Sequence, residues 1–341
     1  GTTQTISGVG FDPEAVIIKS SGNTTAFIKT SFMTGTNSRG FSSTAGFVTN
    51  AITGFGTSAF SIGANAGVNT NGTVYYFYAF KSSNVVKIGT YTGNGAANRN
   101  IVSTGSANTK FVIIVPQSTY GGSVWYTHNN TAAGYSYDDG SPTSHWDSPA
   151  PVTPPTTGFS TVSGADPRTN VNLIVYHYIG FVEVAGECEV NAYTGNGTNG
   201  RALTGLGLNP YFTLSTGGST AILARSRSLT GDATQYFSAT SNASNLIESF
   251  QNSGFTVGND AAVNNNIFNQ TYVVLGGASG GILPIELLHF DVKRLPDKKV
   301  LINWSTATEE NNSYFTIEES EDGTSFEPVG EVEGAGNSSE R

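Results

Sequence analysis

The feature that most constrains this chain is an internal repeat. The pentapeptide Tyr-Thr-Gly-Asn-Gly at positions 91–95 recurs at 193–197, and the same offset of 102 residues pairs Arg99 with Arg201. Self-similarity of this kind is typical of proteins built from copies of one structural module. The chain is therefore expected to contain several homologous units.

Alignment of the copies divides most of the chain into three modules, at 1–83, 84–183 and 184–279. Each module is long enough to bury a core of its own. The second and third modules open with strand-like leads, at 85–91 and 188–193, whereas the first begins just past the equivalent position. We therefore expect the first module to lack its opening strand and to expose an unpaired sheet edge.

Composition favours strands over helices in all three modules. The 341 residues include 42 glycines, and Gly, Thr, Ser and Asn are interleaved with Val, Ile, Phe and Tyr, a mixture typical of strands and turns. Short apolar runs such as 15–18 and 111–115 recur between turn residues, as strands do. Only 242–251 has apolar residues at helical spacing. The predicted class is all-β, with three tandem antiparallel β-sandwiches of jelly-roll type.

Charge and motif content exclude several functions. The chain has 16 Lys+Arg against 25 Asp+Glu, a net charge of −9, and no basic cluster, so nucleic acid is not an expected partner. No apolar run approaches the ~20 residues of a membrane helix, so membrane insertion is not expected. The single cysteine, Cys188, has no partner for an internal disulfide or a metal site. No nucleophile elbow, phosphate loop or acid–base pair stands out; we expect neither an enzyme nor a cofactor.

The C-terminal segment differs from the repeats. Residues 283–341 carry 13 of the 25 acidic residues and follow a glycine-rich, linker-like stretch at 276–281. Four strands are expected there, with Trp304 on the second. This is about half of the seven strands that a fibronectin type III or immunoglobulin-like sandwich needs. The segment is thus predicted to be a partial domain of that type.

Two resemblances add to this interpretation. Leu-Pro-Ile-Glu-Leu-Leu at 283–288 and the run from Val300 to Asn312 resemble the fibronectin type III-like segment that precedes the C-terminal sorting domain of type IX secreted bacterial surface proteins. That resemblance implies export across the outer membrane to the cell surface or the medium. The repeats resemble β-sandwich building blocks of bacterial surface proteins and phage tail proteins, which implies a structural role.

Three groups of residues are candidates for contacts. A weak calcium candidate comprises clustered carboxylates of the second module: Asp138, Asp139 and Asp147. Aromatic residues in the same region are candidates for stacking on sugar rings: Trp125, Tyr126 and Trp146. Candidate subunit contacts lie at the start of the chain, in a proline-rich arm and in the tail: Gly1, Thr2, Thr3, Gln4, Pro151, Pro154, Pro155 and Trp304.

Two functions remain open from the sequence. The first is an extracellular structural protein that assembles head to tail with copies of itself into a filament, sheath or layer, by addition of a strand to the open edge. The second is a cell-surface adhesin or carbohydrate-binding protein whose partners are surface glycans. The low share of charged residues, 12%, suits the first because few charges must be desolvated on self-association.

Overall fold

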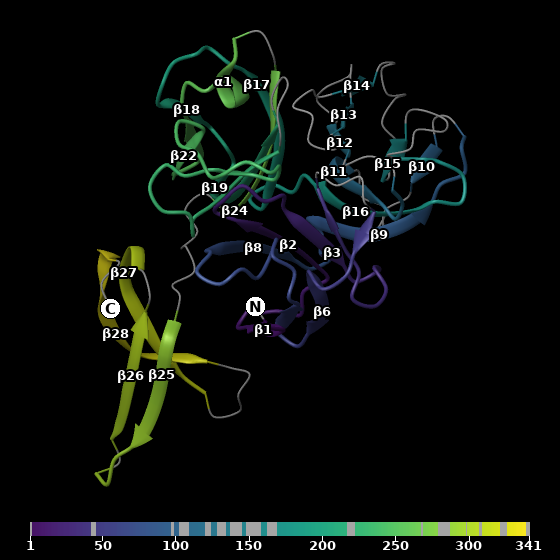
Figure 1. The fold of residues 1–341 in the computed structure, drawn as a ribbon. Helices are drawn as coiled ribbons and strands as arrows, with labels where there is room; N and C mark the ends of the chain where they lie inside the picture. The colour runs from purple at the N-terminus through teal and green to yellow at the C-terminus, as the bar shows by residue number, and fades with distance from the viewer. Residues whose placement is uncertain are drawn as a thin grey trace. The chain divides into compact units, whose positions relative to one another are not determined.

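The fold is known from a computed structural model (Figure 1). It describes residues 2–41, 46–96, 99–101, 109–119, 124–127, 134–136, 145–147, 158–161, 169–216, 222–266, 269–278, 287–297, 299–306, 309–320 and 326–338. Two compact units are present, at 1–279 and 280–341. Each is considered by itself below.

The all-β class is confirmed, with several antiparallel sheets. Among the described residues, helical structure is limited to the single turn α1 (Ala261–Asn264), which Asp260 caps by accepting a hydrogen bond from the Ala262 amide. The helix expected at 242–251 is wrong, because Ile247–Gln251 forms strand β22. The edge strand β22 buries Ile247 and partly buries Phe250, and its pairing with β23 outweighs the helical spacing of its apolar residues.

The first repeat holds two sheets. The smaller has the order β1 (Gln4–Ser7), β7 (Ala59–Ile62), β6 (Ile52–Gly56), and the larger β5 (Phe47–Val48), β4 (Ser38–Gly40), β3 (Phe27–Thr30), β2 (Ala15–Ser20), β8 (Tyr75–Phe80).

The other two repeats follow the same plan. The second pairs β10 (Arg99–Ile101) with β15 (Phe159–Thr161), and its larger sheet runs β14 (His145–Asp147), β13 (Gly134–Ser136), β12 (Val124–Thr127), β11 (Thr109–Pro116), β16 (Val175–Val182), β9 (Val86–Thr92). The third has β18 (Arg201–Thr204), β23 (Gly254–Val257), β22 and, in its larger sheet, β17 (Cys188–Thr194), β24 (Asn269–Ala278), β19 (Leu208–Thr216), β20 (Leu223–Ser226), β21 (Gln235–Tyr236).

Each large sheet is buried on both faces. In the first repeat Val16 and Ile18 face a core shared with the small sheet, whereas Ala15 and Ile17 join a central cluster to which all three repeats contribute. The second and third repeats have sheet cores of their own and share the same central cluster. This explains the uninterrupted apolar runs in the sequence, because a strand with two buried faces does not alternate with polar residues.

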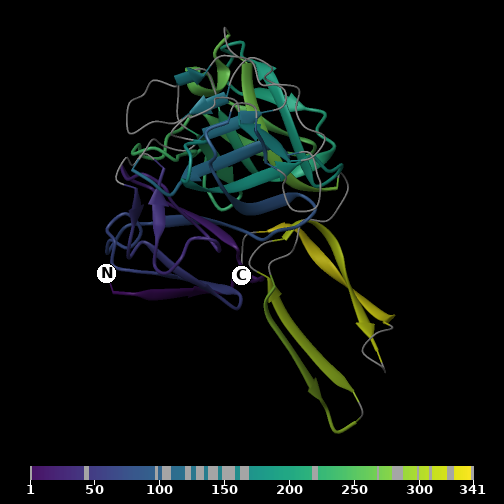
Figure 2. The same cartoon turned by 90° about the vertical axis from the view of Figure 1, so that its right-hand side faces the viewer.

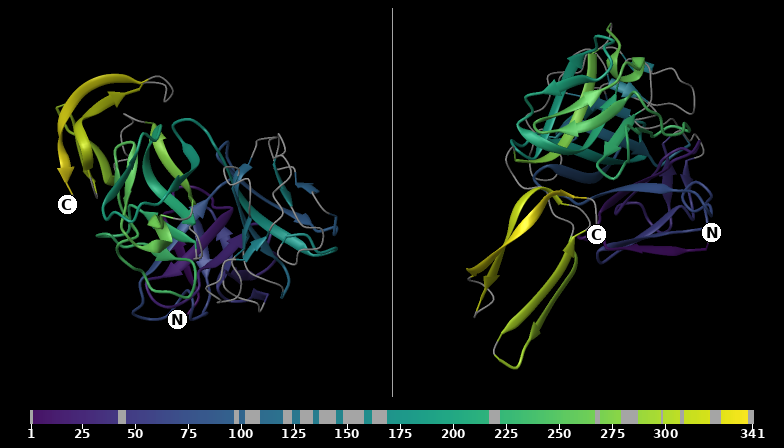
Figure 3. Two further views of the ribbon diagram at one scale, coloured as in Figure 1. Left: turned by 90° about the horizontal axis from the view of Figure 1, so that it is seen from above. Right: turned by 90° about the vertical axis from the view of Figure 1, so that its left-hand side faces the viewer.

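Aromatic rings and hydrogen bonds join the repeats at this central cluster. Phe80 of the first repeat contacts Phe181 of the second and Phe212 of the third, at centroid distances of 5.8 and 5.9 Å. The Tyr78 hydroxyl donates to Gln235 Oε1 at 2.5 Å. The three repeats therefore form one body, in which one face of each large sheet packs on the central cluster. Figures 2 and 3 show the three repeats gathered together.

The C-terminal unit consists of two hairpins. One pairs β25 (Leu287–Arg294) with β26 (Val300–Thr306), and the other pairs β27 (Glu309–Glu319) with β28 (Glu327–Ser338). Trp304 of β26 meets Phe315 of β27 edge to face at 5.4 Å. No helix among the described residues is long and apolar enough to cross a membrane.

Candidate functional site

The site follows from comparing one strand across the three repeats. Strands β8, β16 and β24 each pair with the long central strand of their sheet, which is β2, β11 or β19. On its other side β16 pairs with β9, and β24 pairs with β17. Strand β8 is the last of its sheet, and no strand in the described part of the chain pairs with its outer side.

In the second repeat, the tyrosine of the lead strand β9 fills the space between the two sheets. The Tyr91 ring stacks on Tyr176 at 5.2 Å, and its hydroxyl donates to the carbonyl of Thr169 at 2.7 Å. In the third repeat the Tyr193 hydroxyl donates in the same way to the carbonyl of Val263, at 2.5 Å. Burial raises the pKa of Tyr193 well above its ordinary value, and the charge of Arg201 opposes that shift.

An arginine from the small sheet covers each of these tyrosines. The Arg99 guanidinium lies 5.6 Å from the Tyr91 ring centre, and that of Arg201 lies 5.3 Å from Tyr193, within the range of a cation–π contact. Arg201 also donates to the Thr194 carbonyl at 2.6 Å. The repeated arginine thus holds the end of the lead strand in place.

The asparagine of the pentapeptide binds a second asparagine, and the first glycine of the pentapeptide lies against the backbone that follows this second asparagine. The Asn94 amide donates to Asn170 Oδ1 at 3.1 Å, as the Asn196 amide does to Asn264 Oδ1 at 2.8 Å. A Cβ on Gly93 would lie 2.0 Å from a carbonyl oxygen, that of Val171. Only glycine permits so close an approach, which explains its presence in both copies.

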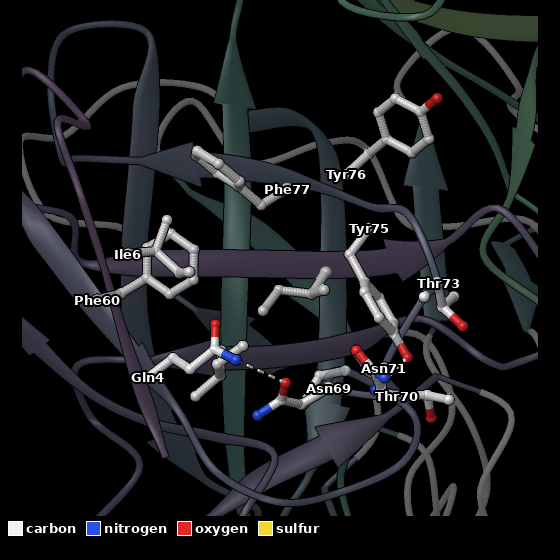
Figure 4. Close-up of a pocket in the computed structure, with 14 residues that line it drawn as sticks. Gln4, Ile6, Phe60, Asn69, Thr70, Asn71, Thr73, Tyr75, Tyr76 and Phe77 are labelled. Atoms are coloured by element: carbon white, nitrogen blue, oxygen red, sulfur yellow. Dashed lines mark hydrogen bonds between the residues drawn. The ribbon is translucent and has the colours of Figure 1, made fainter. Parts of the chain in front are cut away.

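In the first repeat the equivalent position is a cavity of about 360 Å³ beside β8 (Figure 4). Gln4 begins β1, as Arg99 and Arg201 begin their strands, and it donates from Nε2 to Asn69 Oδ1 at 3.2 Å. The cavity is lined by residues of β1, β2, β7 and β8 and of the loop before β8: Gln4, Ile6, Ile18, Phe60, Ile62, Val68, Asn69, Thr70, Asn71, Gly72, Thr73, Tyr75, Tyr76 and Phe77.

The exposure of one aromatic position measures the effect of the open edge. Phe77, Tyr178 and Tyr272 each meet a phenylalanine of the small sheet edge to face, at 5.0, 5.1 and 5.3 Å. Tyr178 and Tyr272 are 3% and 5% exposed, whereas Phe77 is 43% exposed. The first repeat therefore keeps the internal ring pair but presents one of its rings to solvent.

The candidate subunit contacts fall in different parts of the chain. Gln4 lines the cavity, and the Thr2 carbonyl accepts a hydrogen bond from Asn69 Nδ2 at 2.6 Å. Thr3 is exposed beside them. Trp304 lines an apolar hollow between the two C-terminal hairpins, of about 650 Å³. The others lie outside the described residues: Gly1, Pro151, Pro154 and Pro155.

The glycan and calcium candidates are only partly described. Backbone pairing sets Trp125 opposite Tyr135, and Tyr135 opposite Trp146, while Tyr126 pairs with Val112. Asp147 pairs with Gly134 on β14, and Asp138 and Asp139 lie outside the described residues. Within the described part of the chain, no three His, Cys, Asp or Glu residues come together as a metal site would require.

One histidine lies at the contact of two repeats. His177 is on β16 and is 1% exposed, and Thr30 Oγ1 of the first repeat lies 3.3 Å from its Nδ1. Burial, with the charge of Lys29, lowers the pKa of His177 to about 4. The imidazole is therefore neutral at physiological pH and serves packing.

Sequence reasoning singled out Gln4 as a subunit contact but missed Asn69, which accepts its hydrogen bond. Asn69 gave no signal as a single residue, because asparagine is common in strands and loops of this chain. The signal was in the alignment, where Gln4 stands opposite Arg201 and Asn69 opposite Asn264. The first repeat thus has glutamine where the other two repeats carry the arginine that covers a tyrosine.

The fold and the site define an all-β protein with three repeats around one core and an aromatic-lined sheet edge at β8. No family model matches the chain, and no curated protein or solved structure is significantly similar to it.

Proposed function

We propose that the protein is an extracellular structural protein that assembles with copies of itself by adding a strand to β8. Each repeat is a two-sheet sandwich of jelly-roll type, and the C-terminal unit is part of a fibronectin type III-like sandwich. The resemblance of that unit to type IX secreted proteins supports export to the cell surface. No catalytic step or cofactor belongs to this proposal.

The observation that carries the proposal is the 43% exposure of Phe77 on β8, whose outer side pairs with no strand in the described part of the chain. Full burial of a phenylalanine side chain contributes about 1.5–3 kcal/mol, and each new backbone hydrogen bond adds about 1 kcal/mol. A strand added along β8 would gain both contributions. An unprotected edge of this kind is a template for pairing with another chain.

The C-terminal unit offers a second surface for self-association. Its hairpins expose large apolar side chains, among them Phe290 at 58% and Phe326 at 58%. Contiguous exposed apolar surface of this kind marks interaction sites. A head-to-tail contact between this surface and a different surface of the next copy would be heterologous, so that it continues into an open fibre.

The test of assembly uses the full chain. Sedimentation velocity over a range of concentrations, followed by negative-stain electron microscopy, should reveal oligomers that grow into fibres, tubes or sheets. Phe77→Lys should prevent assembly, since a lysine on an edge strand opposes strand addition. Phe32→Lys is the matched control, because Phe32 is 46% exposed in a turn of the same repeat. A chain that stays monomeric at high concentration would refute the proposal.

An adhesin that binds surface glycans is the second candidate, favoured by the row of Trp125, Tyr135 and Trp146 across three strands. Aligned aromatic residues on one sheet are a common platform for sugar rings. This function predicts saturable binding on a glycan array that Trp125→Ala and Trp146→Ala abolish. A blank array would exclude it.

A further inference from the structure

The open edge of β8 and the cavity beside it have two occupied counterparts within the same chain. We infer that they bind a β-strand that carries Tyr-Thr-Gly-Asn-Gly, with its tyrosine ring in the cavity. The inference goes beyond the proposed self-assembly, because it depends only on the edge of β8 and specifies the chemistry of the strand that binds there.

The cavity retains the groups that hold the tyrosine elsewhere. The hydroxyls of Tyr91 and Tyr193 donate to the carbonyls of Thr169 and Val263, and Val68 is the equivalent residue that lines the cavity. Ring contacts are also available, because Tyr75 stands where Tyr176 stacks on Tyr91. A tyrosine in this place finds both its hydrogen-bond acceptor and its aromatic neighbours.

Asn69 retains the acceptor for the main chain of the donor strand. In the other repeats the equivalent Oδ1 accepts the amide of the asparagine in the pentapeptide. Asn69 Oδ1 accepts from Gln4 Nε2, and a carboxamide oxygen has a second lone pair for a further donor. Asn69 Nδ2 donates to the carbonyls of Thr2 and Gly63, and these two hydrogen bonds fix the orientation of the side chain.

The donor must have glycine two residues after its tyrosine. The backbone of Val171 and Asn265 lies about 2 Å from where a Cβ would sit on Gly93 and Gly195 (2.0 and 2.1 Å). Thr70 occupies the same place in the first repeat and lines the cavity. By the pairing of Tyr91 with Tyr176, the donor tyrosine should lie opposite Tyr75.

The donor is therefore not a strand of the described C-terminal hairpins. Their only tyrosine, Tyr314, is followed by Phe315 and Thr316, so that no glycine stands at the required place. A peptide of Glu309–Glu319 is therefore a matched control for a peptide of residues 85–95. Both have 11 residues and contain a tyrosine, but only 85–95 contains the complete pentapeptide.

The test measures binding of a fluorescein-labelled peptide of residues 85–95 to the full chain by fluorescence anisotropy, below the concentration at which the chain assembles. We expect saturable binding of one peptide per chain. Peptides with Tyr91→Ala or Gly93→Val should bind at least tenfold more weakly, and the 309–319 peptide should not compete. Equal binding of the parent and Tyr91→Ala peptides, or no binding of the parent peptide, would overturn the inference.

A gain of affinity provides a test that misfolding cannot imitate. Gln4→Arg restores the residue that covers the tyrosine in the other two repeats, so the parent peptide should bind several-fold more tightly. Unchanged affinity of Gln4→Arg would contradict the assigned position of the ring. Peptide binding by a chain that remains monomeric at high concentration would refute assembly and leave this inference intact. Assembly of a chain that does not bind the peptide would refute this inference and leave the proposed assembly intact.

Discussion

The first and third repeats have the same order of central strands but differ at one edge. In the third, β17 covers β24, and Tyr272 is 5% exposed; in the first, β8 is uncovered, and Phe77 is 43% exposed. The opposite face of β8 is nevertheless buried, since Tyr78 and Phe80 are each 6% exposed against the neighbouring repeats. Strand β8 thus joins the central cluster without a lead strand beside it, although the lead strands of the other two repeats contribute Val86, Ile88, Cys188 and Val190 to that cluster.

The largest expected effect comes from removing the covered ring of the third repeat. Tyr272→Ala should lower the free energy of unfolding by about 3–5 kcal/mol, because it empties a buried aromatic position. Urea denaturation followed by intrinsic fluorescence measures the loss. A cost below about 1 kcal/mol would show that the covered and open edges are energetically alike, and would break the comparison.

The next largest effect is a dependence of the free energy of unfolding on pH, caused by His177 of the second repeat. The folded protein holds the pKa of His177 at about 4, below the 6.5 of an unfolded chain. The unfolded state therefore binds the proton first, and stability falls by about 3 kcal/mol as pH drops from 6.5 to 4. Above pH 6.5 the histidine has no such effect.

The matched variant for this prediction is His177→Thr, which introduces the residue found at the equivalent position of the third repeat, Thr271. Carboxylates titrate in both proteins, so the difference between their urea midpoints from pH 7 to pH 4 isolates the histidine. A pH dependence identical in the two proteins would mean that the imidazole can be protonated without disturbing the contact between repeats.

A smaller effect should follow from making the third repeat resemble the first. Arg201→Gln removes the cation over Tyr193 and the hydrogen bond to Thr194, and we expect a cost of about 1–2 kcal/mol. Urea denaturation measures this cost, and Arg227→Gln, at an arginine of the same repeat that donates to the Pro210 carbonyl, is the control. A larger cost at Arg227 would remove the special role assigned to the repeated arginine.

The smallest effect is expected at the open edge itself. Phe77→Ala should cost the monomer only about 1 kcal/mol, since nearly half of the side chain already contacts water. The same substitution should weaken self-association much more strongly. A loss of stability as large as that of Tyr272→Ala would indicate that β8 is covered in solution.

Much of the architecture could be predicted from residues alone. The recurring pentapeptide indicated the repeats, and the apolar runs between glycines indicated strands. The helix expected at 242–251 failed because a short apolar pattern does not distinguish a helix from an edge strand, and pairing with β23 decided the outcome.

By itself, the sequence determined the all-β class, because that class follows from the local pattern of apolar runs and turn residues. Only the tertiary structure decided that the three large sheets share one core, and that Gln4, Asn69 and Phe77 meet at one cavity. Residues 65 positions apart, such as Gln4 and Asn69, are brought together by sheet pairing. No local preference in the chain encodes which faces of the three repeats bury one another.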